Sequence, residues 1–282
     1  MLLAQITDLH IKLPGVLAYK KVDTAACLRA CVERLNALSP RPDAVLVTGD
    51  LVDFGTVDEY RHLAACLKPL EMPVYLMVGN HDDRAALREV FDARYLHESG
   101  TGSDFVQYAF DLQDMRVIAL DSQKPGQSPG TLCDARLAWL EHQLEAADGR
   151  PVIVALHHPP FATGIGHMDD MALDAQAASK LEALISRYPN VERVLCGHVH
   201  RPVHKRFAGT IASIAPSTAH QVVLDLHVDA PSAFVLEPGA FALHYWTNDV
   251  GLVSHHEYVE QFDGPYPFFD DNGALVDSAL SR

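Results

Sequence analysis

The alternation of strand-like runs with helical periodicity is the feature that most constrains how this chain folds. Runs rich in β-branched and apolar residues are separated by segments whose apolar residues recur every three or four positions. Repeated β-α units of this kind predict an α/β protein whose mostly parallel strands are buried on both faces. The strand-like runs lie at 2–6, 43–49, 73–79, 105–111, 116–121, 151–157 and 191–197, and the helical segments at 22–38, 56–68, 82–91, 134–147 and 174–188.

The pattern changes from about residue 205, where β-rich runs and turn residues replace the alternation. We therefore expect a main domain over 1–216 and a β-rich segment over 217–282 that completes the core and caps the site or joins subunits. Exposed strand edges and the apolar "PYPFF" at 265–269 predict a homo-oligomer, because both would otherwise remain open to water.

Charge and cysteine content exclude several classes of protein. A net charge of −15 repels long polyanions and anionic membranes, so we expect no nucleic-acid polymer and no membrane as partner. No apolar run reaches the ~18 residues of a membrane span, and residues 1–10 lack the basic head and apolar run of a secretory signal. The 5 scattered cysteines favour neither a disulfide framework nor a cysteine zinc site, so a reducing, cytoplasmic location is expected.

Polar side chains follow five of the strand-like runs, at the point where each run ends. Because the carboxyl ends of parallel strands meet at one edge of a sheet, we expect these side chains to share one crevice. The residues in question are Asp8 and His10, Asp50, Asn80 and His81, His157, and His198 and His200.

Carboxylates gathered in a crevice are costly to desolvate and repel one another, and bound cations remove both objections. Carboxylate oxygen, amide oxygen and imidazole nitrogen are ligands of Fe, Mn, Zn and Co. Seven ligands are too many for one open catalytic ion and fit two divalent ions that share a carboxylate. The predicted ligands are Asp8, His10, Asp50, Asn80, His157, His198 and His200.

The motifs "DLH", "GD", "GNHD", "HH" and "GHVH", in this order, resemble those of the metallophosphoesterase (calcineurin-like) superfamily. The residues and spacing of these motifs are most similar to those of bacterial class III cyclic nucleotide phosphodiesterases and bacterial glycerophosphodiesterases. The resemblance implies a four-layer α/β/β/α sandwich with a β-rich C-terminal extension. It also assigns Asp8, His10 and His200 to one ion, Asn80, His157 and His198 to the other, and Asp50 to both.

The same resemblance implies hydrolysis of small phosphodiesters, either 3′,5′-cyclic nucleotides such as cAMP or glycerophosphodiesters, by a metal-bound hydroxide. His81 matches a motif histidine that assists the leaving oxygen, and His220 matches a position near the substrate phosphate. Two alternatives stay open: a phosphomonoesterase of broad specificity, and a scaffold that keeps the fold without catalysis. Three other roles also stay open: substrate contact for Tyr19, a covering loop at 164–171, and turn, cap or orienting roles for Asp53 and Asp82.

Overall fold

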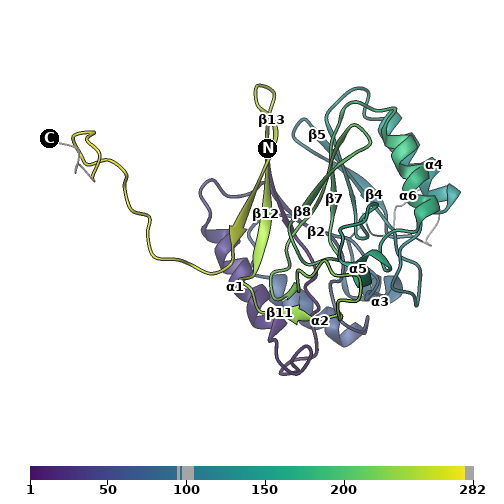
Figure 1. Ribbon diagram of the computed structural model, residues 1–282, viewed down its shortest axis with the longest axis horizontal. Helices are drawn as coiled ribbons and strands as arrows, with labels where there is room; N and C mark the ends of the chain where they lie inside the picture. The colour runs from purple at the N-terminus through teal and green to yellow at the C-terminus, as the bar shows by residue number, and fades with distance from the viewer. Residues whose placement is uncertain (94–95, 97–104, 277–282) are drawn as a thin grey trace.

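The computed structural model describes residues 1–93, 96 and 105–276. Two β-sheets lie face to face, with helices on both outer sides (Figure 1). The first sheet has the order β13-β12-β1-β2-β3 and the second β4-β5-β6-β7-β9-β8, while β10 and β11 form a separate two-stranded ribbon. This arrangement is the predicted four-layer sandwich.

The strands of the first sheet are β1 (Leu2–Ile6), β2 (Ala44–Val47), β3 (Val74–Leu76), β12 (Ala240–Thr247) and β13 (Gly251–Tyr258). Those of the second are β4 (Tyr108–Leu112), β5 (Met115–Leu120), β6 (Val152–Leu156), β7 (Val191–Cys196), β8 (Val203–Phe207) and β9 (Thr210–Ile214). The ribbon pairs β10 (Gln221–Val222) with β11 (Phe234–Val235). The helices are α1 (Thr24–Ala37), α2 (Val57–Leu67), α3 (Arg84–Val90), α4 (Asp134–Glu145), α5 (Gly166–Asp169) and α6 (Ala175–Ile185).

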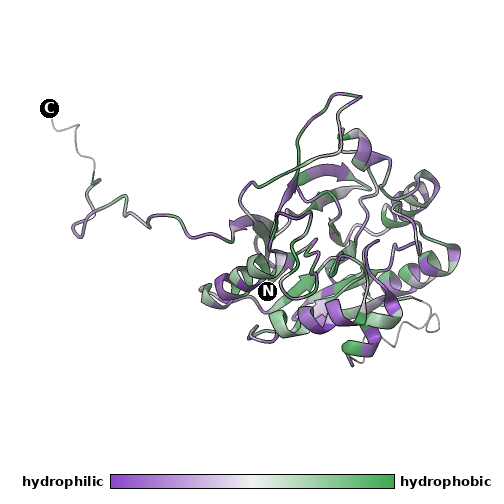
Figure 2. Cartoon of the chain, turned by 90° about the horizontal axis from the view of Figure 1, so that it is seen from below, coloured by the Kyte–Doolittle hydropathy of each residue, from purple (hydrophilic) through white to green (hydrophobic). Residues whose placement is uncertain are grey.

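Alternation along the inner strands divides the core into two layers. In β6, Ile153 and Ala155 pack in the cluster shared with the first sheet, whereas Val154 and Leu156 pack in the cluster that contains α4 and α6. Successive side chains of a strand point to opposite faces, so a fully apolar strand can serve both layers. Figure 2 shows the resulting green strands inside and purple helix faces outside.

The helices begin where the sequence offers capping side chains. Asp23 accepts a hydrogen bond from the Ala26 backbone N–H at the start of α1, and Thr56 forms a reciprocal capping box with Glu59 at the start of α2. Each cap satisfies backbone N–H groups that have no partner within the helix. Asp83, and not Asp82, is the cap of α3.

The C-terminal segment contributes to the core more than the alternation indicated. β12 pairs antiparallel with β1, and β13 pairs with β12, so the chain returns to the sheet in which it began. The β-rich region begins with the hairpin of β8 and β9, and the loop at 164–171 contains the short α5. The domain boundary at residue 216 stays a prediction.

Beyond β13 the chain leaves the body, as the yellow trace in Figure 1 shows. Within the described residues, no helix has the length and apolar character that crossing a membrane requires.

Candidate metal centre

The seven predicted ligands lie together although they come from both sheets. β1, β2 and β3 of the first sheet precede Asp8, His10, Asp50 and Asn80, and β6 and β7 of the second precede the three remaining histidines. The expected single sheet edge is thus a pair of edges, because parallel strands in both sheets end on the same side of the sandwich. His157, His198 and His200 complete the set.

Strained backbone accompanies this convergence. Five ligands have positive φ: Asp8 (54°), His10 (44°), Asp50 (49°), His198 (73°) and His200 (57°). Left-handed backbone costs a non-glycine residue of order 1–3 kcal/mol and persists where the surrounding structure holds it. Part of the folding free energy therefore offsets the strain of the backbone that directs these side chains toward one another.

One group of ligand atoms gathers near the end of β1. The Nε2 atoms of His10 and His200 are 3.2 Å apart, and Nε2 of His200 lies 3.6 Å from Oδ1 of Asp8. Oδ2 of Asp50 lies 3.6 Å from Nε2 of His10. Ligands at about 2.1 Å from one cation are separated from each other by about 3.0–3.4 Å. The four side chains therefore have the spacing of ligands to one ion.

A second group gathers beside it, around His157. Nε2 of His157 lies 3.2 Å from Oδ1 of Asn80, 3.3 Å from Nδ1 of His198 and 3.4 Å from Oδ2 of Asp50. These separations also match a single cation. The same oxygen of Asp50 faces both groups, while its other oxygen accepts a hydrogen bond from the His81 backbone N–H at 3.0 Å. Asp50 is thus placed to be shared.

Close packing of backbone brings the two groups together. A Cβ added to Gly79 would lie 2.2 Å from Oδ1 of Asp50, and one added to Gly49 would lie 2.5 Å from Nδ1 of His157. Any larger residue at either position would push a ligand away. These glycines are required for the approach of β2, β3 and β6.

Hydrogen bonds fix which nitrogen three of the histidines present. The acceptors are two carbonyls and a carboxylate, so the ring proton is on Nδ1 and Nε2 carries a lone pair. Nδ1 of His10 donates to Oδ1 of Asp53 (3.2 Å), that of His157 to the carbonyl of Thr48 (2.8 Å), and that of His200 to the carbonyl of His220 (3.0 Å).

Bound cations account for the direction of these ring nitrogens, which the contacts among the described residues alone do not explain. Nε2 of His10 and Nε2 of His200 face each other across 3.2 Å, and two neutral rings with Nδ1–H would direct two lone pairs at each other there. His198 is buried, points Nδ1 at His157, and has no hydrogen-bond partner on Nε2 among the described residues. Imidazole, carboxylate and amide ligands are those that Fe, Mn, Zn and Co accept, so the residues present suit two divalent ions.

In the metal-free chain, protons have to compensate the buried charges. Burial raises the pKa of Asp8 to about 6. Burial alone would lower the pKa of His157, but the carboxylates of Asp50 and Asp8 outweigh it and raise the value to about 9. Burial, assisted by His10, lowers the pKa of His200 to about 3. A protonated His157 thus supplies positive charge where divalent ions would otherwise supply it.

Comparison with known proteins places the chain in a family. The model of the calcineurin-like phosphoesterase family matches residues 1–202. The chain is 40% identical over 277 residues to a probable glycerophosphodiester phosphodiesterase, GpdQ, of Arcobacter nitrofigilis, covering 98% of this chain and 100% of that protein. The chain belongs to the calcineurin-like phosphoesterase family.

Other members of the calcineurin-like phosphoesterase family extend the comparison. A probable cyclic nucleotide phosphodiesterase of Rhodopseudomonas palustris is 34% identical over 273 residues, 96% of each chain. A dimetal phosphatase from Danio rerio has the same fold, with a TM-score of 0.67 at 15% identity over 92% of this chain and 99% of its own. The predicted family and fold are confirmed, and the relatives' names agree with the predicted phosphodiester hydrolysis. Divalent metal ions suit both the family and the ligand groups.

A pocket of ≈ 390 Å³ opens above the ligands of this phosphoesterase. One wall is aromatic: the ring of Tyr19 lies 5.0 Å from that of Phe234 and 5.3 Å from that of His220. The lining also includes Met168 of α5 and Met171 just after it. Tyr19 was an open candidate in the sequence, and it does line the pocket. The two methionines belong to the 164–171 loop, the open candidate for a covering loop, and they line the pocket. Phe234 was missed, because no spacing rule links its loop to the strand ends.

Asp53 and Lys12 support the first group of ligands. Oδ2 of Asp53 accepts a hydrogen bond from Lys12 Nζ at 2.5 Å. The backbone carbonyl of Asp53 accepts one from Nδ1 of His81 at 2.8 Å. Asp53 therefore orients His10 and His81 together, which resolves its open role. Lys12 was missed, although it follows His10 at the i+2 spacing that places extended residues on one side.

Asp82 and His158 have structural partners. Asp82 accepts from the backbone N–H groups of Leu51 (3.1 Å) and Gly79 (2.8 Å) and from the hydroxyl of Tyr60 (2.8 Å), which ties the ends of β2 and β3 together. The two ring nitrogens of His158 bond with the Ser122 hydroxyl and the Ser128 carbonyl. Neither side chain is free to act as a ligand, in agreement with a supporting role.

Proposed function

We propose that the chain hydrolyses small phosphodiesters at a centre of two divalent ions, with glycerophosphodiesters as its first substrate class. The observation that carries the proposal is the pair of ligand groups that share Oδ2 of Asp50. The near full-length similarity to a protein named as a glycerophosphodiester phosphodiesterase supports the substrate class.

Asp8, His10 and His200 would hold one ion, Asn80, His157 and His198 the other, and Asp50 both. Two bound divalent ions lower the pKa of water toward neutrality and offset the negative charge of phosphoryl oxygens. Fe, Mn, Zn and Co all suit these ligands, and metal analysis of the purified chain decides among them.

His81 is proposed as the proton donor to the leaving oxygen. Its Nδ1–H is held by the carbonyl of Asp53, so the ring can act as a donor only in its cationic form, through the second proton on Nε2. Its ring lies 4.6 Å from that of His10, edge to face, and it lines the pocket. A donor fixed at the rim of the site can protonate an alkoxide as it departs.

His220 is proposed to act as a neutral hydrogen-bonding group. Burial, assisted by His200 and His10, lowers its pKa to about 2, so it carries no charge at neutral pH. Nδ1 of His220 has no partner among the described residues, and its ring lines the pocket. A neutral imidazole in the pocket wall suits a hydrogen bond to substrate and not proton transfer.

The walls support small diesters with an uncharged or cationic leaving group. No Lys or Arg is found among the described residues that line the pocket, so a second anionic group on the substrate would have no ion-pair partner. Ethanolamine or choline would meet the π-faces of Tyr19 and Phe234, which attract alkylammonium groups. Cyclic nucleotides are the second candidate, because the same rings can stack on a base and the 34% identical relative carries that name.

Steady-state kinetics on cAMP, cGMP, glycerophosphoethanolamine and glycerophosphocholine, with metal content measured on the same sample, tests this choice. We expect the glycerophosphodiesters to have the higher kcat/KM. Preference for p-nitrophenyl phosphate over bis(p-nitrophenyl) phosphate would instead make the chain a phosphomonoesterase. No turnover with any divalent metal would make it a scaffold.

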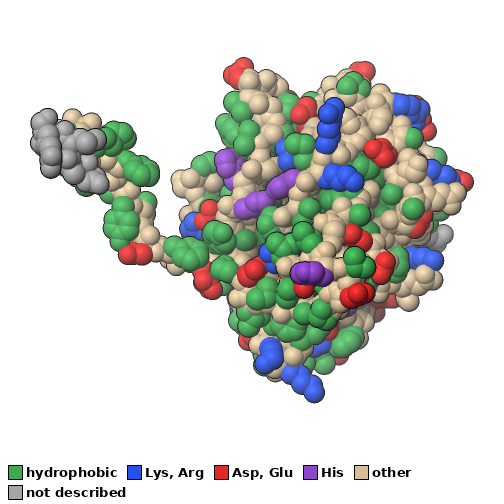
Figure 3. Space-filling view, viewed as in Figure 1, with side chains coloured by type: hydrophobic (Ala, Val, Ile, Leu, Met, Phe, Trp, Pro, Cys, Tyr) green, Lys and Arg blue, Asp and Glu red, His purple; other side chains and the backbone are tan. Residues whose placement is uncertain are grey.

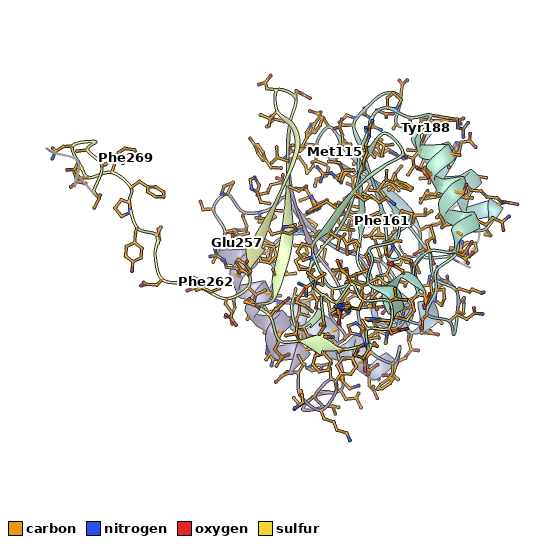
Figure 4. All side chains as sticks on the ribbon, in the orientation of Figure 1. Met115, Phe161, Tyr188, Glu257, Phe262 and Phe269 are labelled. Carbon is orange, nitrogen blue, oxygen red and sulfur yellow. The ribbon has the colours of Figure 1, made fainter. Side chains whose placement is uncertain are left out.

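We also propose that the chain is a homo-oligomer joined by the segment 260–276. Phe262, Tyr266 and Phe268 are 61%, 71% and 82% exposed, and Figure 4 shows Phe262 and Phe269 on a trace that lies away from the body. Aromatic groups left in water favour a covering partner, and a second copy is the partner always present. Light scattering of the full chain should give a mass above 30.9 kDa, and a monomer would contradict the proposal. The cytoplasmic location stays a prediction, to be tested by cell fractionation.

A further inference from the structure

A second feature lies outside the pocket, on the inner face of β8 and β9 where the first sheet ends at β13. An open groove of ≈ 580 Å³ is bordered by Arg193 of β7, His204 and Arg206 of β8, Ile211 of β9 and Leu252 of β13. It shares no residue with the pocket above the metal ligands. Figure 3 shows histidine, Lys and Arg side chains gathered on this face over β8 and β12.

The strand register brings two guanidinium groups to one row of this groove. Arg193 pairs with Ile211, and Ile211 pairs with Arg206, so the two arginines flank Ile211 on adjacent strands. Arg193 and Arg206 are two strands apart, and neighbouring strands are about 4.8 Å apart, so the backbones of the two arginines lie about 10 Å from each other. Their long side chains can both reach a group bound above Ile211, which is 41% exposed.

Arg193 has cationic hydrogen-bonding capacity that the described protein leaves unused. It is only 8% exposed, its Nε has no hydrogen-bond partner among the described residues, and its Nη2 makes only a long 3.5 Å contact with the Leu252 carbonyl. Among the described residues, neither Arg193 nor Arg206 forms an ion pair, although acids outnumber basic residues in the chain by 37 to 22. Glu192 also borders the groove without pairing with Arg193. A buried guanidinium normally has an anionic partner, because desolvation without one is costly.

The next row of the groove adds the imidazole of His204, which pairs across the strands with the buried Ser213. His204 stands 5.5 Å from the ring of His256 on β13. Two guanidiniums beside an imidazole form a donor set that binds oxyanions, and the fork of Arg matches phosphate oxygens.

We propose that this groove binds a phosphate group, as inorganic phosphate or a phosphomonoester, between Arg193 and Arg206. The site is independent of the metal centre, since residues 194–196 of β7 separate Arg193 from the loop that carries His198. It does not depend on the proposed function.

Equilibrium dialysis of the zinc-loaded full chain against labelled inorganic phosphate tests the proposal. We expect Arg206→Gln to bind about one phosphate fewer per chain than the unaltered chain, or to bind the phosphate in the groove at least about tenfold more weakly. Loss of a charge-assisted hydrogen bond has an effect of this size. Arg206 is exposed, so this variant should fold even if Arg193→Gln does not. Arg61→Gln, which removes the same charge from α2, should bind as the unaltered chain does.

A parallel series with glycerol 3-phosphate separates the two sources. Loss of either ligand in Arg206→Gln supports the proposal and identifies which form the groove accepts. Turnover of bis(p-nitrophenyl) phosphate should be unchanged in Arg206→Gln. Equal binding of both ligands by Arg206→Gln and the unaltered chain would overturn the proposal, as would an equal loss in Arg61→Gln.

Discussion

The floor of the pocket and its walls are built on different parts of the fold. The floor consists of the seven metal-ligand candidates, which follow five strand ends and in part have left-handed backbone. Asp8 and His157 lie buried beneath the other five, which line the pocket. The walls consist of Tyr19, His167, Met168, Met171 and Phe234, which lie on loops, on the short α5 and on a two-residue strand. We infer that the strands fix the chemistry and that the loops select the substrate, as loops on a rigid scaffold commonly do.

The largest effect should come from the residue that both ligand groups share. Asp50→Ala removes the oxygen that faces the two groups, so kcat/KM on bis(p-nitrophenyl) phosphate should fall by roughly 10⁴-fold, in line with several kcal/mol of lost charge stabilisation. Bound metal should fall in the same sample. Asp58→Ala, an exposed acid of α2, is the control and should keep both. Full activity of Asp50→Ala would contradict the inference that the floor carries the chemistry and the walls select the substrate.

His81→Ala, at the rim of the pocket, separates the chemistry from metal binding by the floor. We expect a loss of roughly 10²–10³-fold in kcat, the usual cost of a missing proton donor. Metal content should not change, since His81 is not among the seven ligand candidates. A substrate with a leaving group that needs no proton, such as p-nitrophenolate, should lose less than a glycerophosphodiester. An equal loss on both substrates would argue against proton donation.

Lys12→Met tests the support beneath the floor. Without its ion pair, Asp53 holds His10 less firmly, and such supporting partners are worth about 10–100-fold in metal affinity. Isothermal titration of the metal-free chain measures this directly. Lys12→Arg should restore most of the affinity, and Lys20→Met, an exposed neighbour, should have no effect. Full affinity in Lys12→Met would limit the role of Lys12 to packing.

Metal uptake should depend on pH through His157. Its pKa of about 9 in the metal-free chain means that a proton occupies the ligand nitrogen at neutral pH. Affinity should therefore rise about tenfold per pH unit from pH 7 to 9, with close to one proton released for each His157 that binds metal. Titrations in buffers of different ionisation enthalpy measure that release. A flat profile would show that His157 is not protonated there.

The same shift predicts how the stability of the metal-free chain varies with pH. The pKa of His157 is raised above its ordinary value of 6.5, so its contribution is complete below pH 6.5 and is lost as pH rises through about 9. Below pH 6.5 the lowered pKa values of His200 and His220 act in the opposite direction and outweigh the raised pKa of Asp8. The Tm of the chelator-treated chain should therefore fall between about pH 6.5 and 9, whereas the metal-loaded chain should not follow this trend.

The smallest effects should come from the walls. Tyr19→Leu and Phe234→Leu remove aromatic faces worth about 0.5–1.5 kcal/mol, so KM for glycerophosphocholine should rise by about 2–10-fold. Turnover of bis(p-nitrophenyl) phosphate and metal content should barely change. Equal losses on all substrates would place these rings among the supports of the floor, through the contact of Tyr19 with His220.

The sequence predicts the floor well because strand ends obey simple rules. Asp8 and His10, or His198 and His200, follow apolar runs whose ends meet at one side of the sandwich. Their left-handed backbone, which the extended i, i+2 spacing did not predict, also directs the side chains to the site. Their division between two sheets was not evident from single runs, since it depends on how strands 2–6 and 191–197 pack across the core.

The walls were mostly beyond sequence reasoning for a physical reason. Phe234 reaches the pocket because β11 pairs with β10 just after His220, and a two-residue strand has no periodicity to read. Likewise, β12 belongs to the first sheet through its pairing with β1, a contact between the two ends of the chain. Long-range pairings of this kind leave no local pattern.

The crystal structure of the manganese-loaded chain, with anomalous scattering used to locate the metal, tests the central claim most directly. We predict two peaks about 3.5–4 Å apart on either side of the Asp50 carboxylate, each within bonding distance of one ligand group. A single peak, or peaks that do not contact Asp50, would contradict the account.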